Sequence, residues 1–311
     1  MISVVVVTYS PGELLDGFLD SLSAATDAPY EVVLADNGSV DGAPERASER
    51  PEVRLLPLGG NLGYGRAANA GIDACTGELV VVANPDIVWS VGSLDALVAA
   101  SERWPCAGSL GPLILTPTGE LYPSARELPS LGRGIGHALC GWWWPSNPWT
   151  KAYRLEHEPP SERAVGWLSG SCLLLRREAY DAVGGFDPAY FMYFEDTDLG
   201  ARLGQAGWSN VLVPDAVVTH FGGHATSRVA DQMLREHHAS ARRYLFRRYS
   251  GWAWLPVRLG LRAGLAIRMA LARWLPAVGQ GARPGRTAPV ELTGRRGSRR
   301  STRFGRGRKG I

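Results

Sequence analysis

The sequence predicts an α/β protein whose Rossmann-like, mostly parallel sheet is flanked by helices. Three observations support this fold class. Short, β-branched apolar runs alternate along the chain with segments of helical spacing, which is the order of a parallel α/β sheet. The run at residues 2–7 is almost continuously apolar, as in a strand that is buried on both faces. Three of the runs end in polar clusters, and open α/β sheets bind their ligands at these strand ends.

The predicted elements follow this alternation from the N-terminus onward. The strands are expected at residues 2–7, 31–35, 53–56, 78–83, 167–177 and 211–220. The helices are expected at residues 13–23, 64–75, 178–183, 197–206 and 228–250. Between residues 105 and 160, proline, glycine and tryptophan dominate and the alternation breaks down. Such a stretch indicates functional or mobile loops.

Charge divides the 311-residue chain into unequal parts. The formal net charge is +3, but residues 281–311 hold nine arginines and one lysine against a single acid, Glu291. This tail is therefore about +9 and the rest of the chain about −6. Few large apolar residues occur in the tail, so we expect it to be disordered. We predict an α/β domain over 1–250, amphipathic helices over 251–280 and a disordered Arg-rich tail over 281–311.

The segment 251–279 has the pattern of a helix that lies in a membrane interface. Arg258, Arg262, Arg268 and Arg273 fall on one helical face spanning about 140°, and tryptophans and leucines surround them. These arginines exclude a membrane span. We expect peripheral binding to an anionic membrane surface, on the inner face of the cell membrane. The alternative is a helix packed on the main domain with its arginines in water.

The cysteines and the N-terminus indicate a cytoplasmic protein. Cys75, Cys106, Cys140 and Cys172 form no CxxC pair, so we expect reduced, mostly buried thiols in place of zinc ligands or disulfides. The apolar run at the N-terminus is too short for a signal peptide and lacks a basic region and a cleavage site. We therefore expect a cytoplasmic location.

The polar clusters at three strand ends are TYSP at 8–11, DNGS at 36–39 and NPD at 84–86. Each cluster alone is also what turn chemistry produces. Three of them at one edge of a sheet favour a binding site. Within DNGS, Asp36 is suited to accept a hydrogen bond from a pyrimidine ring N–H, with an Asx-turn as the alternative.

Asp86 of the NPD cluster is a candidate metal ligand. A carboxylate that directly follows a buried strand, beside Asn84, suits a hard divalent cation such as Mg²⁺. His220 and His224, in HFGGH, are further candidates. Because two glycines separate them, helical i,i+4 geometry is not assured. We expect one of these histidines to contact the metal or a phosphate, and not both.

The turn NLGYGRAAN at 61–69 is a candidate phosphate site. Its glycines let the backbone approach a ligand, and the helix N-terminus that follows favours phosphate. It matches neither GxxxxGK[ST] nor GxGxxG after the first strand, so we expect neither an ATPase nor a nicotinamide-dependent enzyme.

The stretch FMYFEDTD at 191–198 joins three aromatic rings and a methionine to three carboxylates. Asp196 and Asp198 lie at the start of a predicted helix, where the dipole stabilises them, and capping explains one of them. A carboxylate against apolar walls has a raised pKa and can act as a general base. Sugar rings also stack well on aromatic faces. We therefore predict an acceptor pocket in which the rings give the shape and one acid takes a proton.

Seven motifs, in this order, resemble those of the family 2 glycosyltransferases with the GT-A fold: VVVVTYS, DNGSVDG, NLGYGRAAN, ANPD, WLSGSCLLLRR, GGFDPAYFMYFEDTDLGARL and THFGG. Within that family the match is closest to bacterial rhamnosyltransferases of the WbbL type. The resemblance covers roughly residues 1–250, and only the combination of motifs is specific. It implies inverting transfer of L-rhamnose from dTDP-L-rhamnose to a lipid-linked saccharide, such as GlcNAc-diphospho-polyprenol, in cell-wall or surface polysaccharide assembly.

The resemblance also implies roles for individual residues. Asp196, the second acid of its pair with Glu195, matches the catalytic base. Asp86, which we expect to act with His220, stands where the DxD motif holds Mg²⁺ or Mn²⁺; NPD has one carboxylate fewer. The predicted donor-nucleotide residues are Thr8, Tyr9, Asp36, Asn37, Ser39, Asn61, Gly63, Asn69 and Asn84. The predicted acceptor residues are Trp167, Gly170, Ser171, Tyr193 and Phe194.

Two alternatives stay open at this point. One is a transferase of the same fold with another donor, such as a galactofuranosyl or glucosyl donor. The other is a non-catalytic RNA- or membrane-binding protein that acts through its basic tail. The strand-end clusters and the acids beside aromatic rings favour the enzyme, because a simple binding module needs neither. We expect a nucleotide-sugar donor, a polyprenyl-diphosphate-linked acceptor and no specific nucleic acid; a homodimer stays open.

Overall fold

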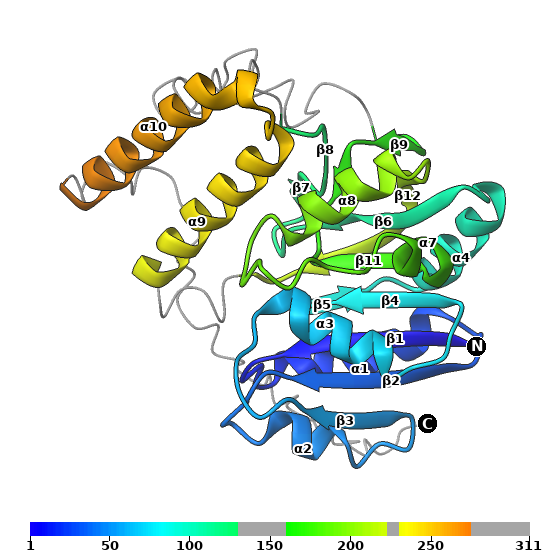
Figure 1. Cartoon of the computed structure of the whole chain (residues 1–311). Helices are drawn as coiled ribbons and strands as arrows, with labels where there is room; N and C mark the ends of the chain where they lie inside the picture. Colours follow the sequence, from blue (N-terminus) through cyan, green and yellow to red (C-terminus); the bar gives the residue numbers. More distant parts are fainter. Residues whose placement is uncertain (130–159, 223–229, 275–311) are drawn as a thin grey trace, which may run out of the picture. The chain divides into compact units, whose positions relative to one another are not determined.

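The structure is a computed structural model that describes residues 1–129, 160–222 and 230–274. A mixed sheet runs through it in the strand order β3-β2-β1-β4-β11-β6-β12-β5, with β7 beside β6 and β9 beside β12 (Figure 1). Its first half is parallel, because β1 pairs with β2 and β4, and β2 pairs with β3. The parallel strands are β1 (Ile2–Thr8), β2 (Tyr30–Asp36), β3 (Val53–Pro57) and β4 (Leu79–Ala83).

In the second half of the sheet, parallel and antiparallel pairs are mixed. β11 (Cys172–Arg176) lies antiparallel to both β4 and β6, and β12 (Ser209–His220) then pairs with β6 in parallel. The remaining strands of this sheet are β5 (Ile87–Trp89), β6 (Ala107–Leu115), β7 (Leu121–Tyr122) and β9 (Arg163–Val165). A separate two-stranded sheet pairs β8 (Ala125–Arg126) with β10 (Trp167–Leu168). The predicted strand at 167–177 is thus two strands, with Ser169–Gly170–Ser171 between them.

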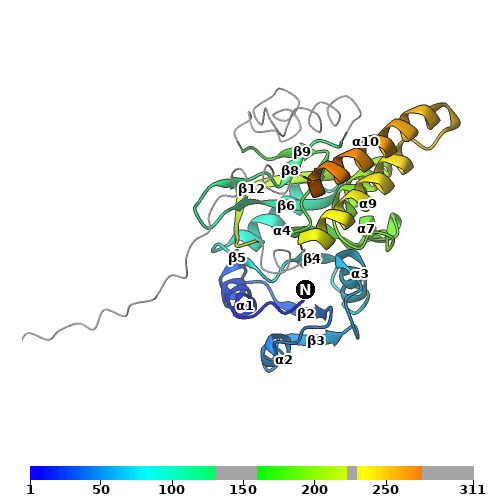
Figure 2. The ribbon, with the colours of Figure 1, turned by 90° about the vertical axis from the view of Figure 1, so that its left-hand side faces the viewer.

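Helices cover both faces of the sheet, because successive strand residues point to opposite sides. Val4 and Val6 belong to one buried cluster and Val5 and Val7 to the other. Figure 2 shows α1 and α3 on opposite sides of the strands. The first cluster includes residues of α1 (Leu14–Ala25) and α4 (Ser93–Arg103), and the second includes residues of α3 (Tyr64–Asp73), α7 (Arg177–Ala182) and α8 (Glu195–Gln205). A short helix, α2 (Ala43–Ala47), follows the second strand.

The expectation of loops from residue 105 onward is wrong for β6, which lies inside the sheet. Its sequence AGSLGPLIL carries two glycines and a proline. A Cβ at Gly108 would lie 2.9 Å from side-chain atoms of Leu203, and one at Gly111 would lie 3.0 Å from Leu168. Neighbouring side chains fill the glycine positions, and Pro112 sits where the pairing with β12 shifts its register. The residues that hide the strand signal are therefore packing residues.

The C-terminal half contains α9 (Ala230–Arg248), a 3₁₀ turn η2 (Trp252–Trp254) and α10 (Leu255–Trp274). In the described part of the chain, no helix has the length and apolar character that a bilayer crossing needs. The tail at 281–311 lies outside the described residues, and the domain limits at 250 and 280 stay predictions. Cys75 and Cys172 are buried free thiols, Cys106 is an exposed one, and Cys140 lies outside the described residues.

Candidate active site

A cavity of about 460 Å³ lies at the carboxyl ends of β1, β2 and β4. It brings together most of the residues that the sequence singles out. From the donor, metal, acceptor and acid groups, it contains Tyr9, Asn37, Asn61, Asn84, Asp86, Trp167, Gly170, Ser171, Tyr193, Phe194, Glu195, Asp196 and His220. Thr8, Asp36, Ser39, Gly63 and Asn69 do not line it. His224 lies outside the described residues.

Thr8, Asp36 and Ser39 build the turn behind the cavity wall. The buried Asp36 carboxylate accepts hydrogen bonds from the Thr8 hydroxyl at 2.8 Å and from the Ser39 hydroxyl at 2.5 Å. Its second oxygen accepts the Ser39 backbone N–H at 3.1 Å. This is the Asx-type turn named above as the alternative. The hydrogen bond from Thr8 connects the end of β1 to the end of β2. Recognition of a nucleotide base by Asp36 stays a prediction.

Asn37 and Gly63 connect that turn to the acid-bearing segment. The Asn37 side chain accepts the Leu62 N–H at 2.9 Å and donates to the Gly63 carbonyl at 3.3 Å. Gly63 has φ +88° and ψ 167°, a region that only glycine adopts readily. A Cβ at this position would lie 2.2 Å from the carbonyl oxygen of Phe191, which accepts the Tyr64 N–H at 3.0 Å. Gly63 therefore permits the close approach of the NLGYGRAAN turn to the FMYFEDTD segment.

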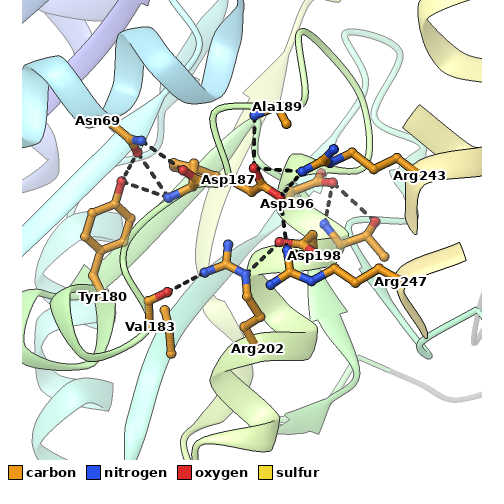
Figure 3. A network of polar contacts seen from close by, with 12 residues as sticks. Asn69, Tyr180, Val183, Asp187, Ala189, Asp196, Asp198, Arg202, Arg243 and Arg247 are labelled. Carbon is orange, nitrogen blue, oxygen red and sulfur yellow. Dashed lines mark hydrogen bonds and ion pairs between the residues drawn. The ribbon is translucent and has the colours of Figure 1, made fainter. Parts of the chain in front are cut away.

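Asn69 holds the chain just before that segment. Its amide donates to the Phe186 carbonyl at 2.9 Å and accepts the Phe186 N–H at 3.1 Å. The Tyr180 hydroxyl also donates to Asn69, as Figure 3 shows. Burial raises the pKa of Tyr180, so this hydroxyl stays a donor. These contacts give Asn69 a scaffolding role one layer behind the cavity.

Asp86 and His220, the predicted metal ligands, face each other in the cavity. Antiparallel pairing of β5 with β12 sets Ile87 opposite His220, which places the His220 Nε2 atom 3.1 Å from Asp86 Oδ1. Although this contact is short, Asp86 Oδ1 is buried and accepts no aligned hydrogen bond from the described residues. The Asn84 amide nitrogen lies 3.4 Å from the same His220 atom.

This donor set fits a cation that is only partly held by protein. Among the described residues, no cluster of three or more His, Cys, Asp or Glu side chains is present. Mg²⁺ usually takes one or two carboxylates and completes its shell with water and substrate phosphates. The Asp86 oxygen without an aligned hydrogen bond and the His220 Nε2 atom would give such a cation two protein ligands.

Glu195 and Asp196 occupy the first turn of α8, where the helix dipole stabilises negative charge. Asp196 Oδ2 accepts the Gly170 N–H at 3.0 Å, and Oδ1 accepts the Thr197 N–H at 2.7 Å and its hydroxyl at 3.3 Å. Glu195 is buried, and its Oε2 has no hydrogen-bond partner in the described part of the chain. The two neighbouring acids therefore have different surroundings.

This difference separates their protonation. Burial, followed by the charge of Asp196, raises the pKa of Glu195 to about 8. Burial also raises the pKa of Asp196, but the hydrogen bonds from Gly170 and Thr197 and the charge of Arg126 oppose that rise. Carboxylates whose environments push their pKa values apart divide acid and base roles between them. These surroundings favour Asp196 as the ionised member of the pair and Glu195 as the member that carries the proton.

The acids follow a turn with unusual backbone angles. Tyr193 has φ +68° and Phe194 has φ +67°, so two consecutive residues other than glycine lie in the left-handed region. Such residues cost about 1–3 kcal/mol each and persist only where their surroundings enforce them. Phe194 is the N-cap residue of α8, so this turn sets the direction in which the acids enter the cavity.

The predicted acceptor side includes β10, the residues that follow it and the neighbouring β8. The buried Trp167 donates its indole N–H to the Glu127 carbonyl at 3.1 Å, and the Arg126 guanidinium lies 5.3 Å from its ring centre. Gly170 lies between Tyr64 and Asp196: a Cβ there would be 3.5 Å from the Tyr64 ring and 3.4 Å from Asp196 Cβ. The Tyr64 hydroxyl donates to the Gly170 carbonyl at 2.5 Å.

Several lining residues were not expected from the sequence. They include Tyr64, Tyr122, Arg126, Met192 and His237. Tyr64 stands inside the NLGYGRAAN motif, where its aromatic ring was a usable signal. Tyr122 and Arg126 belong to a stretch without periodicity. His237 lies on a basic helix far from the other motifs, so only the tertiary structure brings it to the cavity.

Residues 3–184 match the family described as Glycosyl transferase family 2, and residues 159–239 match Glycosyltransferase like family 2. The chain is 56% identical over 281 residues to N-acetylglucosaminyl-diphospho-decaprenol L-rhamnosyltransferase of Mycobacterium tuberculosis, with 86% of this chain and 91% of that protein covered. It is 26% identical over 256 residues to rhamnosyltransferase WbbL of Escherichia coli, with 80% and 94% covered.

The solved structure of mannosyltransferase PcManGT from Pyrobaculum calidifontis, in complex with GDP-Man and Mn²⁺, has a TM-score of 0.54. It is 19% identical and covers 91% of this chain and 76% of its own. At this identity the likeness shows the fold, and it confirms the predicted GT-A class. Because the family match spans more than half of the sequence and the mycobacterial relative is 56% identical, the chain belongs to glycosyltransferase family 2.

Proposed function

We propose that this enzyme transfers L-rhamnose from dTDP-L-rhamnose to the sugar of GlcNAc-diphospho-polyprenol, with inversion at the anomeric carbon. One observation carries the chemistry: a single cavity holds the Asp196 carboxylate, which accepts hydrogen bonds from Gly170 and Thr197, and a separate Asp86–His220 pair suited to a diphosphate-bound cation. The 56% identity to a protein named as a GlcNAc-diphospho-decaprenol rhamnosyltransferase supports the sugar and the acceptor. The dTDP carrier rests on the resemblance between the motifs.

The reaction needs one displacement step. Asp196 accepts the proton of an acceptor hydroxyl as that oxygen attacks the anomeric carbon from the face opposite the diphosphate. The new bond joins the acceptor oxygen to the anomeric carbon, and the bond from that carbon to the diphosphate oxygen breaks. The proton stays on Asp196, and the nucleotide leaves as dTDP. Because no sugar–enzyme bond forms, a second nucleophilic carboxylate is unnecessary, which agrees with a protonated Glu195.

Asp86 and His220 would hold a Mg²⁺ or Mn²⁺ ion, which would neutralise the charge that builds on the leaving diphosphate. The Mn²⁺ in the solved mannosyltransferase of the same fold supports a divalent cation in general. Asn84 lies beside His220 and would orient its ring. Which of the two ions serves is left to the metal experiment.

The walls of the cavity divide it into a donor side and an acceptor side. On the donor side, Tyr9, Asn37 and Asn61 would receive the nucleotide, with the Asp36 turn behind them. On the acceptor side, Tyr193 and Phe194 give the aromatic surface on which a sugar ring stacks. The Ser169 and Ser171 hydroxyls, 3.1 Å apart, add polar contacts next to Gly170.

The acceptor is lipid-linked, so we also propose that the chain binds the inner membrane surface through residues 251–311. Around η2 and the start of α10, large apolar side chains are exposed, including Trp252 (90%), Trp254 (42%), Leu255 (51%) and Leu259 (57%). Arg258 and Arg262 lie on the same stretch. Exposed tryptophan and leucine beside arginine is typical of a helix in a lipid interface.

A donor and acceptor panel tests the proposed function. Purified full-length protein is incubated with lipid-linked GlcNAc and, in turn, dTDP-L-rhamnose, UDP-galactofuranose, UDP-glucose and UDP-GlcNAc, and the lipid product is weighed by mass spectrometry. We expect the mass of one deoxyhexose to be added from dTDP-L-rhamnose only, and no product without acceptor. Faster transfer from another donor would replace rhamnose in the proposal and keep the family.

A further inference from the structure

Helix α9 contacts the segment from Asp187 to Asp198, which contains the acid pair, at both of its ends. At the first end, Asp187 Oδ2 lies 3.0 Å from a guanidinium nitrogen of Arg243 and 3.0 Å from one of Arg247. At the other end, Arg247 lies 3.5 Å from Asp198 Oδ1, and Arg202 of α8 lies 2.6 Å from Asp198 Oδ2. Figure 3 shows these side chains converging from α8, from α9 and from the loop between α7 and α8.

A third contact lies in the middle of the segment. The Ser240 hydroxyl donates to the Met192 carbonyl at 2.9 Å. The His237 ring lies edge-on to the rings of Tyr193 and Phe194, with centres 5.4 Å and 5.5 Å apart. Tyr244 of the same helix is buried, and its ring centre lies 5.6 Å from that of Phe194.

These contacts surround the two residues with left-handed backbone. Tyr193 and Phe194 need external contacts to keep their positive φ angles, and Glu195 and Asp196 follow directly. On one side the segment is held by Gly63 and Tyr64 through the Phe191 carbonyl. On the other side the described residues that hold it belong to α9. The turn that leads into Asp196 is therefore contacted by a helix that follows the last strand of the sheet, while Gly170 and Thr197 bind the carboxylate itself.

We propose that α9 positions the catalytic base, with Ser240, Arg243 and Arg247 as positioning residues. This inference rests on the proposed function in taking Asp196 as the base. The arginines neutralise Asp187 and Asp198 at both ends of the segment, and Ser240 fixes the backbone between them. A helix that only stabilised the fold would need no contact with the left-handed turn. Loss of the three contacts releases the turn and misaligns Asp196, while the donor side, built on β1, β2 and β4, stays intact.

The test compares Arg243→Gln/Arg247→Gln with two matched controls. The first, Arg243→Lys/Arg247→Lys, keeps both charges. The second, Arg242→Gln, removes an exposed arginine of the same helix that has no ion pair within the described part of the chain. We expect kcat of the glutamine double variant to fall by about 10-fold or more, since small misplacements of a catalytic group are costly. The KM for the donor stays within about 2-fold, the lysine variant recovers most of the rate, and Arg242→Gln behaves as wild type.

Hydrogen exchange gives a readout that needs no substrate. In the glutamine double variant, the amides of residues 190–198 exchange faster while those of β1 and β4 keep their protection. A donor KM that rises as much as kcat falls, or unchanged exchange at 190–198, overturns the positioning role. If the double variant does not fold, Ser240→Ala gives the same two readouts with a smaller effect, and unchanged values there overturn the proposal as well. Failure of the wild type to transfer rhamnose bears on the proposed function, and the exchange result still decides this inference.

Discussion

The backbone N–H of Gly170 donates to Oδ2 of Asp196 at 3.0 Å, and this hydrogen bond joins the loop between β10 and β11 to the acid pair. Gly170 is itself held through its carbonyl, which accepts the Tyr64 hydroxyl. Burial raises the pKa of Tyr64 well above its ordinary value, so this hydroxyl remains a donor. Among the described residues a hydrogen-bond donor points at Asp196 and none points at Glu195 Oε2, which favours the second acid as the ionised one.

The first prediction concerns the metal pair. Asp86→Ala removes the oxygen without an aligned hydrogen bond, so we expect weaker nucleotide-sugar binding and no further response to added Mg²⁺ or Mn²⁺. Titration of dTDP with and without each ion measures this, and Asp73→Ala, an exposed carboxylate at the end of α3, is the control. Full wild-type activity in excess chelator would remove the metal from the account.

The second prediction concerns stability and pH. The pKa of Glu195 rises from 4.5 to about 8 on folding, so its neutral form is favoured in the folded state. The stability that this contributes is complete below pH about 4.5 and is lost as the pH rises through about 8. Glu195→Gln is neutral at every pH and escapes the loss. Urea unfolding at several pH values should show that the free energy of unfolding of the variant increases relative to that of wild type between pH about 4.5 and about 8. The same pH dependence of this free energy in both proteins would contradict a raised pKa.

The third prediction tests the close approach at Gly63. Gly63→Ala would place a methyl group 2.2 Å from the Phe191 carbonyl oxygen at a φ of +88°. We expect it to lower the free energy of unfolding by about 2 kcal/mol or more and to lower activity. Gly59→Ala, at φ +76° with no atom of the described chain within 4 Å, is the control for the positive φ. Equal losses in the two variants would mean that the contact with Phe191 adds nothing.

The fourth prediction concerns the membrane. The full chain should co-sediment with vesicles that contain anionic lipid, and less so in high salt, because each basic residue near the surface contributes about 1 kcal/mol. A chain that ends at residue 250 should lose this binding. Trp252→Ser/Trp254→Ser in the full chain should weaken it while the basic tail remains. Equal sedimentation of the shortened and full chains, both folded by circular dichroism, would exclude a C-terminal anchor.

The sequence predicts most of this fold because the strands of its first half are rich in valine and other apolar residues. The prediction fails at β6. There Gly108 packs against Leu203, Gly111 packs against Leu168, and Pro112 lies at a shift in register with β12. Those causes lie in other elements and leave no local pattern. The same holds for the short β8 and β10, which have two residues each.

The site is predictable where a motif ends a strand or starts a helix, as at Asp86 and at Glu195–Asp196. The sequence does not separate cavity residues from residues that hold the cavity. Asn69 and Ser39 have the chemistry of ligand contacts, yet their side chains bind Phe186 and Asp36. The sequence also does not reveal His237 or Arg126 as cavity residues, because both lie far from the acid pair in sequence and belong to no motif.

The measurement that tests the central claim most directly is the single-turnover rate of sugar transfer by Asp196→Asn, beside Glu195→Gln. Asn keeps the shape of Asp196 and removes the base, so we expect the rate to fall by about 10²-fold or more while dTDP affinity is kept. Glu195→Gln, which replaces a group that is already protonated at neutral pH, should keep the rate within about 10-fold of wild type. Transfer by Asp196→Asn at the wild-type rate would contradict the account and leave Glu195 or Asp198 as the base.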